Sequence, residues 1–346
     1  MAKKTKAKLD YNALVRRLHA DGPARLYLLY GPEEYLRERF LDELRAACVP
    51  EGNEFSLRRL NGPALDLPAL EEAVNAAPFF TERSFVEVRD WNLNRCGEAD
   101  LKRLKALVTD IPDYCTVAFV ADAANPPDGR LSVTKLLKKE GQAVEFTEPD
   151  SAALCGWIAS RFRALGKSIG RQDAEHLIFL CGTQMLDLIP EIEKAAAFAA
   201  GDTVTRAEID ATASRKPEAD VWAMTESLGA RRFDAAAEVL SELLGTKENH
   251  PILLTALIAQ QFRRLYAVKV GADERLDRAE IMELCGVRYD FIYDRLLSAA
   301  KPYSLEQLGR IVTLCADYDY RMKSSGGDPF VLVTELFARI AAEAGA

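Results

Sequence analysis

Residues 26–41, "LYLLYGPEEYLRERFL", decide the fold of the first part of this chain. A hydrophobic run meets Gly31 and Pro32 and passes directly into an amphipathic helical pattern. This order of strand, turn and helix is where a nucleotide-binding α/β domain has its phosphate loop. That loop also requires G-x-x-x-x-G-K-[ST], because its lysine and hydroxyl contact the phosphates and Mg²⁺. Here Glu33 and Glu34 come next, and the required positions hold no lysine, hydroxyl or second glycine.

The acidic pair that would bind Mg²⁺ and activate water is also missing. The run "SFVEVRDW" ends near Asp90, and no glutamate follows it, so we interpret Asp90 as a turn residue at the end of a strand. Catalysis of phosphoryl transfer depends on positioning and charge neutralisation. We therefore expect no ATP hydrolysis, no tight ATP binding and no bound cofactor. Glu33 and Glu34 are explained as acids at the positive end of a helix.

A second stretch, "RALGKSIG", contains Gly166, Lys167 and Ser168, which look like the end of a phosphate loop. The first glycine of the motif would be at position 161, which is Arg161. The tripeptide also follows an amphipathic helix, whereas a phosphate loop follows a buried strand. We interpret it as a turn between helices, with Ser168 or Gly170 near the next helix start.

Composition limits the classes of function. The net charge of the 346 residues is −8, and neither the first 214 residues nor the rest is basic, so the chain alone should not bind DNA strongly through charge. No apolar run is long enough for a membrane span. The N-terminal "MAKKTKAKLDY" resembles a basic tail rather than a signal peptide.

The cysteines and histidines give no site. Seven cysteines are widely spaced without C-x-x-C, which favours structural thiols in a reduced cytoplasm over disulfides or zinc. The three histidines lie far apart in the sequence, so we predict no metal site. No other catalytic motif is present.

The pattern of periodicities predicts an α/β part followed by helical parts. Five β-like runs alternate with helical patterns up to residue 149, which indicates a three-layer α/β domain with a mainly parallel sheet. After Pro149 we expect the strands to stop. A small helical domain is predicted over 150–214 and a helical bundle over 215–346. The five runs are RLYLLYG, FSLRRLNG, SFVEVRD, TVAFVAD and QAVEFTE.

One apolar feature stands apart from these patterns. "NAAPFFTERS" places Phe79 and Phe80 after a helix and before a strand, with Pro78 disfavouring continuation of the helix. The residues alone favour core packing of the two rings. The alternative is an exposed aromatic wedge that enters a pocket of a partner protein.

In this order, the segments resemble the delta subunit of the bacterial DNA polymerase III clamp loader over nearly the whole chain. No single segment is diagnostic by itself, because each is apolar and degenerate. The segments that carry the resemblance are LYLLYGPEEYLRERFLDEL, FSLRRLNG, LEEAVNAAPFFTERSFVEVRD, YCTVAFVADAANP, WIASRFRALGKSI and GTQMLDLIPEIEKAAAFA.

The resemblance implies an AAA+-type α/β domain (1–149), a small helical lid (150–214) and a helical collar (215–346). It implies a degenerate phosphate loop at Gly31, Pro32, Glu33 and Glu34, with ATP handled by sister subunits. The implied clamp-binding residues are Pro78, Phe79, Phe80, Thr81 and Arg83.

The resemblance also implies a function and partners. The chain would bind and open the ring-shaped sliding clamp, the beta subunit, as a non-catalytic cytoplasmic subunit of the DNA polymerase III holoenzyme. Other loader subunits, of the gamma/tau and delta-prime types, would bind through the collar. Primer-template DNA would be contacted only within the complex, and no membrane is involved. The alternatives are an active AAA+ ATPase, such as an initiator or motor-type loader subunit, and a helical adaptor unrelated to replication.

Overall fold

The computed structural model describes residues 10–49, 53–62, 66–247, 249–324 and 327–345. Most of the basic N-terminal tail therefore lies outside the described residues. The chain divides into two compact units, Met1–Glu148 and Pro149–Ala346. Each unit is described by itself.

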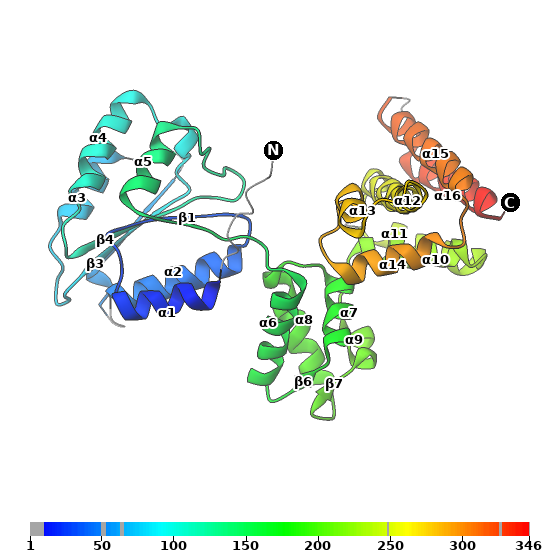
Figure 1. Ribbon diagram of the computed structural model, residues 1–346, viewed down its shortest axis with the longest axis horizontal. Coiled ribbons are helices and arrows are strands. Elements are labelled where there is room, and N and C mark those ends of the chain that lie inside the picture. The colour runs from blue at the N-terminus through cyan, green and yellow to red at the C-terminus, as the bar shows by residue number, and fades with distance from the viewer. Residues whose placement is uncertain (1–9, 50–52, 63–65, 248, 325–326, 346) are drawn as a thin grey trace. The chain divides into compact units, whose positions relative to one another are not determined.

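The first unit is built on a five-stranded parallel sheet with the order β2-β3-β4-β1-β5 (Figure 1). All five predicted strands are confirmed. β1 lies inside the sheet, where Leu28 is level with Phe119 of β4 on one side and with Ala143 of β5 on the other. The strands are β1 (Leu26–Tyr30), β2 (Leu57–Asn61), β3 (Ser84–Arg89), β4 (Cys115–Val120) and β5 (Gln142–Glu145).

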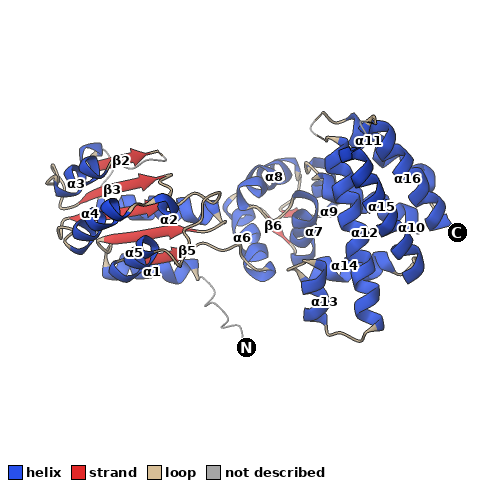
Figure 2. Cartoon of the chain, turned by 90° about the horizontal axis from the view of Figure 1, so that it is seen from above, coloured by secondary structure: helices blue, strands red, loops and turns tan. Residues whose placement is uncertain are grey.

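Helices cover both faces of the sheet, as the top view of Figure 2 and the side view of Figure 1 show. Successive residues of a strand point to opposite faces. Leu26 and Leu28 therefore pack with α3, α4 and α5, whereas Tyr27 and Leu29 pack with α1 and α2. The helices are α1 (Tyr11–Asp21), α2 (Glu34–Cys48), α3 (Leu67–Asn75), α4 (Glu98–Thr109) and α5 (Ser132–Glu140).

The predicted three-layer α/β architecture with a parallel sheet is thus confirmed. The helix α1 was not predicted, although Asp10 caps its first turn by accepting a hydrogen bond from the amide of Ala13. Two short 3₁₀ turns complete the unit, η1 (Glu54–Ser56) and η2 (Leu93–Arg95).

A buried ion pair fixes α2 on the sheet. The Glu87 side chain on β3 is fully buried, and Arg45 of α2 donates two hydrogen bonds of 2.9 Å to its two carboxylate oxygens. Such bidentate pairs fix geometry as well as contributing energy. The position of α2, and with it the turn between β1 and α2, is therefore set by charge as well as by apolar packing.

The second unit begins with four helices and contains two short strands. β6 (Ser168–Ile169) and β7 (Thr203–Val204) pair in parallel, so the prediction that strands stop after Pro149 is wrong. Two-residue strands are too short to produce a periodic pattern. The helices of this region are α6 (Ser151–Ala164), α7 (Arg171–Cys181), α8 (Met185–Phe198) and α9 (Arg206–Thr212).

The remaining described elements are helices, as predicted, and they share an apolar core. α12 lies at its centre and packs against α10, α13, α14, α15 and α16. Among the described residues, no helix combines the length and the hydropathy needed to cross a membrane. The helices are α10 (Pro217–Gly229), α11 (Phe233–Gly245), α12 (Pro251–Asp273), α13 (Arg278–Cys285), α14 (Asp290–Ala300), α15 (Leu305–Ser324) and α16 (Pro329–Gly345).

The division of the second unit into a lid and a collar stays a prediction. The proposed boundary at residues 214 and 215 falls in the connection between α9 and α10.

Candidate functional site

The turn after β1 is closed around Gly31. Its φ is +120°, a conformation that side chains rarely adopt, and an added Cβ would lie 2.3 Å from the carbonyl oxygen of Phe146. That same carbonyl accepts a hydrogen bond of 3.1 Å from the amide of Glu33. The Gly31 carbonyl in turn accepts a hydrogen bond of 2.9 Å from Nη1 of Arg37. The Gly31 carbonyl and the Glu33 amide are therefore bonded to the chain itself.

Glu33 occupies the place that a phosphate takes in an active loop. Its side chain is 1% exposed and caps α2 by accepting a hydrogen bond of 3.2 Å from the amide of Tyr35. Burial raises the pKa of this carboxyl to about 7. A helix N-terminus is where an active loop binds phosphate, and here a carboxyl of the chain itself caps it. Glu34 is exposed in the first turn of the same helix, as expected of an acid at its positive end.

The two other candidate nucleotide elements serve as turns. Asp90 is exposed directly after β3 with φ of +62°, a left-handed conformation that Asp tolerates better than most residues. Lys167 donates hydrogen bonds of 2.8 and 2.7 Å to the carbonyls of Ala199 and Gly201. Ser168 begins β6, and Gly170 precedes α7, so the interpretation of this stretch as a connection between helices is confirmed.

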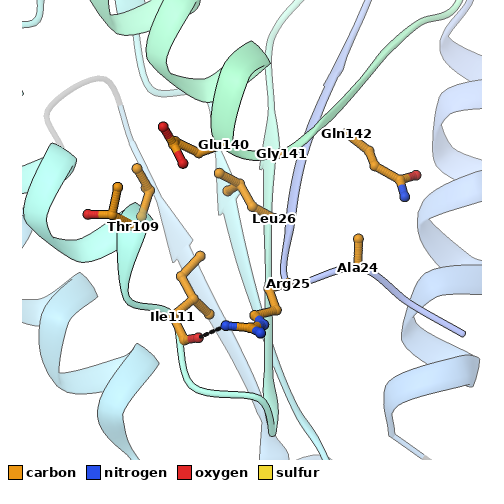
Figure 3. A pocket seen from close by; sticks show the side chains of 9 residues that line it. Ala24, Arg25, Leu26, Thr109, Ile111, Glu140, Gly141 and Gln142 are labelled. Atoms are coloured by element: carbon orange, nitrogen blue, oxygen red, sulfur yellow. Dashed lines mark hydrogen bonds between the residues drawn. The ribbon is translucent and has the colours of Figure 1, made fainter.

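A cavity of about 420 Å³ is shown in Figure 3. It lies at the amino ends of the strands, whereas the turn at Gly31 follows the carboxyl end of β1. Residues 24–26, 108–111 and 140–142 contribute to its lining, at the amino ends of β1 and β5 and before β4. Arg25 in its wall donates a hydrogen bond to the Ile111 carbonyl. Ligands of open α/β sheets bind outside the carboxyl ends of the strands, so this is not a nucleotide position.

The aromatic pair lies at the same end of the sheet, where β2 and β3 begin. α3 ends at Asn75, and the chain turns through Pro78, Phe79 and Phe80 before β3 begins at Ser84. The two rings contact each other at a centroid distance of 4.2 Å.

Both rings are exposed, Phe79 by 58% and Phe80 by 86%. The interpretation of the pair as core residues is therefore wrong. Phe80 also has φ of +58°, which costs a bulky L-residue roughly 1–2 kcal/mol. This conformation turns the chain so that two adjacent apolar residues both leave the core. A left-handed residue other than glycine gives no signal in sequence periodicity, which explains the error.

A buried serine fixes the backbone of the pair. Ser56 is 3% exposed, and its Oγ accepts a hydrogen bond of 3.0 Å from the amide of Phe79 and donates one of 3.1 Å to the carbonyl of the same residue. Nδ2 of Asn53 donates a second hydrogen bond, of 2.9 Å, to that carbonyl. The hydroxyl of Thr81 lies 2.7 Å from Ser56 Oγ and 2.8 Å from the carbonyl of Arg83. The wedge is thus held by side chains from the segment before β2.

The neighbouring residues named from the sequence lie at the base of the wedge. Pro78, Thr81 and Arg83 are all half-buried. Nη1 of Arg83 reaches the carbonyl of Pro23 at 3.4 Å, which ties the start of β3 to the residues before β1.

Phe55 and Ser56 were not predicted as site residues, because the run FSLRRLNG places both in the strand that follows. They instead form the turn η1, and β2 begins at Leu57. Neighbouring parallel strands begin at the same edge of a sheet, and Leu57 is level with Phe85. If β2 had been assumed to pair with β3, the segments before Leu57 and before Ser84 would have been predicted to meet.

Two family models match the chain. The model described as "DNA polymerase III, delta subunit" matches residues 27–147, and that described as "DNA polymerase III delta subunit, C-terminal domain" matches residues 218–340. The chain belongs to the DNA polymerase III delta subunit family. It is therefore a clamp-loader component and a protein of DNA replication.

Relatives of the delta family align over most of the chain. DNA polymerase III subunit delta of Bacillus subtilis (strain 168) is 26% identical over 323 residues, which cover 90% of this chain and 91% of the relative. A probable DNA polymerase III subunit delta of Aquifex aeolicus (strain VF5) is 23% identical and covers 83% of each chain.

A solved Bacillus subtilis DNA clamp loader delta protein has the same fold, with a TM-score of 0.60 at 22% identity. The alignment covers 96% of this chain and 99% of that one. The predicted three-layer α/β part with a parallel sheet, followed by helical parts, is confirmed.

Proposed function

We propose that this delta-family chain binds the ring-shaped sliding clamp through Phe79 and Phe80, and that this binding opens the ring for loading onto primed DNA. The observation that carries the proposal is the exposure of two adjacent phenylalanines, 58% and 86%, in a strained turn of a clamp-loader component. Strained backbone is concentrated at functional sites, because the surrounding structure must maintain it.

The energy available from the two rings is sufficient for a specific contact. A phenylalanine can bury about 150–250 Å², worth roughly 4–6 kcal/mol at about 25 cal/mol per Å². Ordering and desolvation reduce this gain to the few kcal/mol typical of a hot-spot residue. Because the Ser56 hydrogen bonds already fix the Phe79 backbone, little further ordering of that backbone is required on binding.

Ring opening needs no covalent chemistry. In this proposal the pocket of an open clamp binds the wedge more tightly than the pocket of a closed clamp does. Binding then shifts the population toward the open form by the difference in affinity for the two forms. The chain therefore acts as a non-catalytic subunit of the DNA polymerase III holoenzyme.

ATP is handled by partner subunits in this proposal. The Gly31 carbonyl and the Glu33 carboxyl are bonded within the chain, and no lysine or hydroxyl stands at the phosphate-binding positions. Residues 215–346 form the collar that binds the other loader subunits, of the gamma/tau and delta-prime types. Primer-template DNA is contacted only within that assembly, in the cytoplasm.

The experiment that tests ring opening is clamp unloading without ATP. Fluorescent sliding clamp from the same organism is placed on nicked circular DNA, and its release on addition of this chain is followed by gel filtration. We expect release in excess of the spontaneous rate, and no excess with a Phe79→Ala/Phe80→Ala variant. Equal release by both proteins, or none by either, would contradict the proposal.

A further inference from the structure

A third exposed phenylalanine adjoins the wedge. Phe55 lies in the turn η1 before β2 and is 72% exposed. Its ring packs edge to face on the ring of Phe79, with a centroid distance of 6.4 Å and an interplanar angle of 73°. Phe79 contacts Phe80 in turn, so the three rings form a continuous row from two separate segments of the chain.

The same serine joins the two segments. Ser56 follows Phe55 directly, and its hydroxyl makes two hydrogen bonds to the Phe79 backbone. Phe55 is therefore held in register with Phe79 rather than being an independent surface residue. Large apolar side chains that gather on a surface mark interaction sites, whereas scattered single ones do not.

We propose that Phe55 is a third clamp-contact residue, which extends the wedge of Phe79 and Phe80 into a three-ring apolar surface. This inference rests on the proposed function, since it names a further residue of the same site. The partner surface would be an apolar pocket for Phe79 and Phe80 with an adjacent apolar surface for Phe55. Aromatic residues at the centre of such contacts carry a large share of binding energy.

The geometry assigns Phe55 two effects. Its own exposed face buries area against the clamp. Its edge contact also limits the orientations of the Phe79 ring, and aromatic pairs of this kind contribute beyond the area they bury. Phe55 and Phe79 should therefore be energetically coupled in clamp binding, since residues in contact show non-additive effects.

The test is clamp affinity of the full-length chain, measured by calorimetry for Phe55→Ala, Phe79→Ala and Phe80→Ala. The matched control is Phe198→Ala, because Phe198 is also 60% exposed but lies at the end of α8 in the other unit. We expect Phe55→Ala to raise the dissociation constant about tenfold and Phe198→Ala to leave it unchanged. Thermal unfolding should match the parent protein for both, because both rings are exposed.

Three further results decide between this inference and the function on which it rests. A Phe55→Ala/Phe79→Ala variant that loses less affinity than the product of the single losses supports the coupling. Loss of affinity in Phe79→Ala and Phe80→Ala but not in Phe55→Ala overturns the inference and leaves the proposed function standing. Parent-like binding by all three single variants overturns both.

Discussion

At the scale of single residues, Glu33 shows how a phosphate site is converted into a structural turn. The buried carboxyl caps α2 where a bound phosphate would otherwise meet the helix amides. The Arg37 guanidinium, which could have attracted an anion, donates to the carbonyl of Gly31 instead. The frame of strand, turn and helix is kept because it positions α2 on the sheet.

The Glu33 carboxyl should make stability depend on pH. Its pKa is about 7 in the folded chain against an ordinary value of 4.5, so the folded state binds more protons than the unfolded state between these pH values. Stability should therefore fall as pH rises from about 4.5 to 7. Glu33→Gln removes this charge. The unfolding free energy of the variant, relative to that of the parent, should therefore rise by about 2 kcal/mol between pH 5 and pH 8.

Urea unfolding of both proteins at pH 5 and pH 8 checks this prediction. The remaining titratable groups are shared, so the difference between the two proteins isolates Glu33. If the difference in unfolding free energy between the two proteins is the same at both pH values, the carboxyl does not titrate as described.

Gly31 should be the least replaceable residue of the turn. Gly31→Ala adds a Cβ at 2.3 Å from the Phe146 carbonyl to the strain of φ +120°. Gly62→Ala is the matched control, because Gly62 has φ +130° but no atom within 4 Å of an added Cβ. We expect the control to lose about 1–2 kcal/mol of unfolding free energy and Gly31→Ala to lose clearly more. Equal losses in urea unfolding would mean that the turn relaxes around the methyl group.

At the scale of elements, the turn η1 acts as the support of the wedge. Ser56→Ala removes the two hydrogen bonds that Ser56 makes to the Phe79 backbone and leaves only the one from Asn53, so the wedge backbone should be less firmly fixed. We expect a several-fold weaker affinity for the clamp with a more unfavourable binding entropy, since ordering then occurs on binding. Calorimetry measures both quantities.

A purely structural role of Ser56 would give a different result. If Ser56 acts through the wedge, adding Ser56→Ala to the Phe79→Ala/Phe80→Ala variant should change clamp affinity little further. If the two losses multiply instead, Ser56 affects binding by another route. Thermal unfolding of each variant separates either case from a general loss of stability.

The strands and long helices could be predicted from the sequence, whereas short elements and the turn could not. β1 to β5 are short β-like runs bounded by turn residues, and helices such as α4 carry a clear apolar stripe. β6 and β7 have two residues each, too few for any period. The exposure of Phe79 depends on the left-handed Phe80 and on a hydroxyl 23 positions earlier, and neither is visible in local sequence.

At the scale of the whole molecule, the two ends of the strands in the first unit carry different features. The carboxyl edge of the sheet, where a nucleotide would bind, is closed by the chain's own groups. The amino edge presents the aromatic wedge. The candidate clamp contact and the turn at Gly31 thus lie at opposite ends of the strands.

The central claim is that Phe79 and Phe80 bind the sliding clamp, and calorimetric titration tests it most directly. The chain is titrated against its own organism's clamp without nucleotide, beside a Phe79→Ala/Phe80→Ala variant with unchanged thermal unfolding. We predict tight binding by the parent chain and at least a hundredfold weaker binding by the variant, in line with two hot-spot residues. Equal binding by both proteins would contradict the site, and binding by neither would contradict the function.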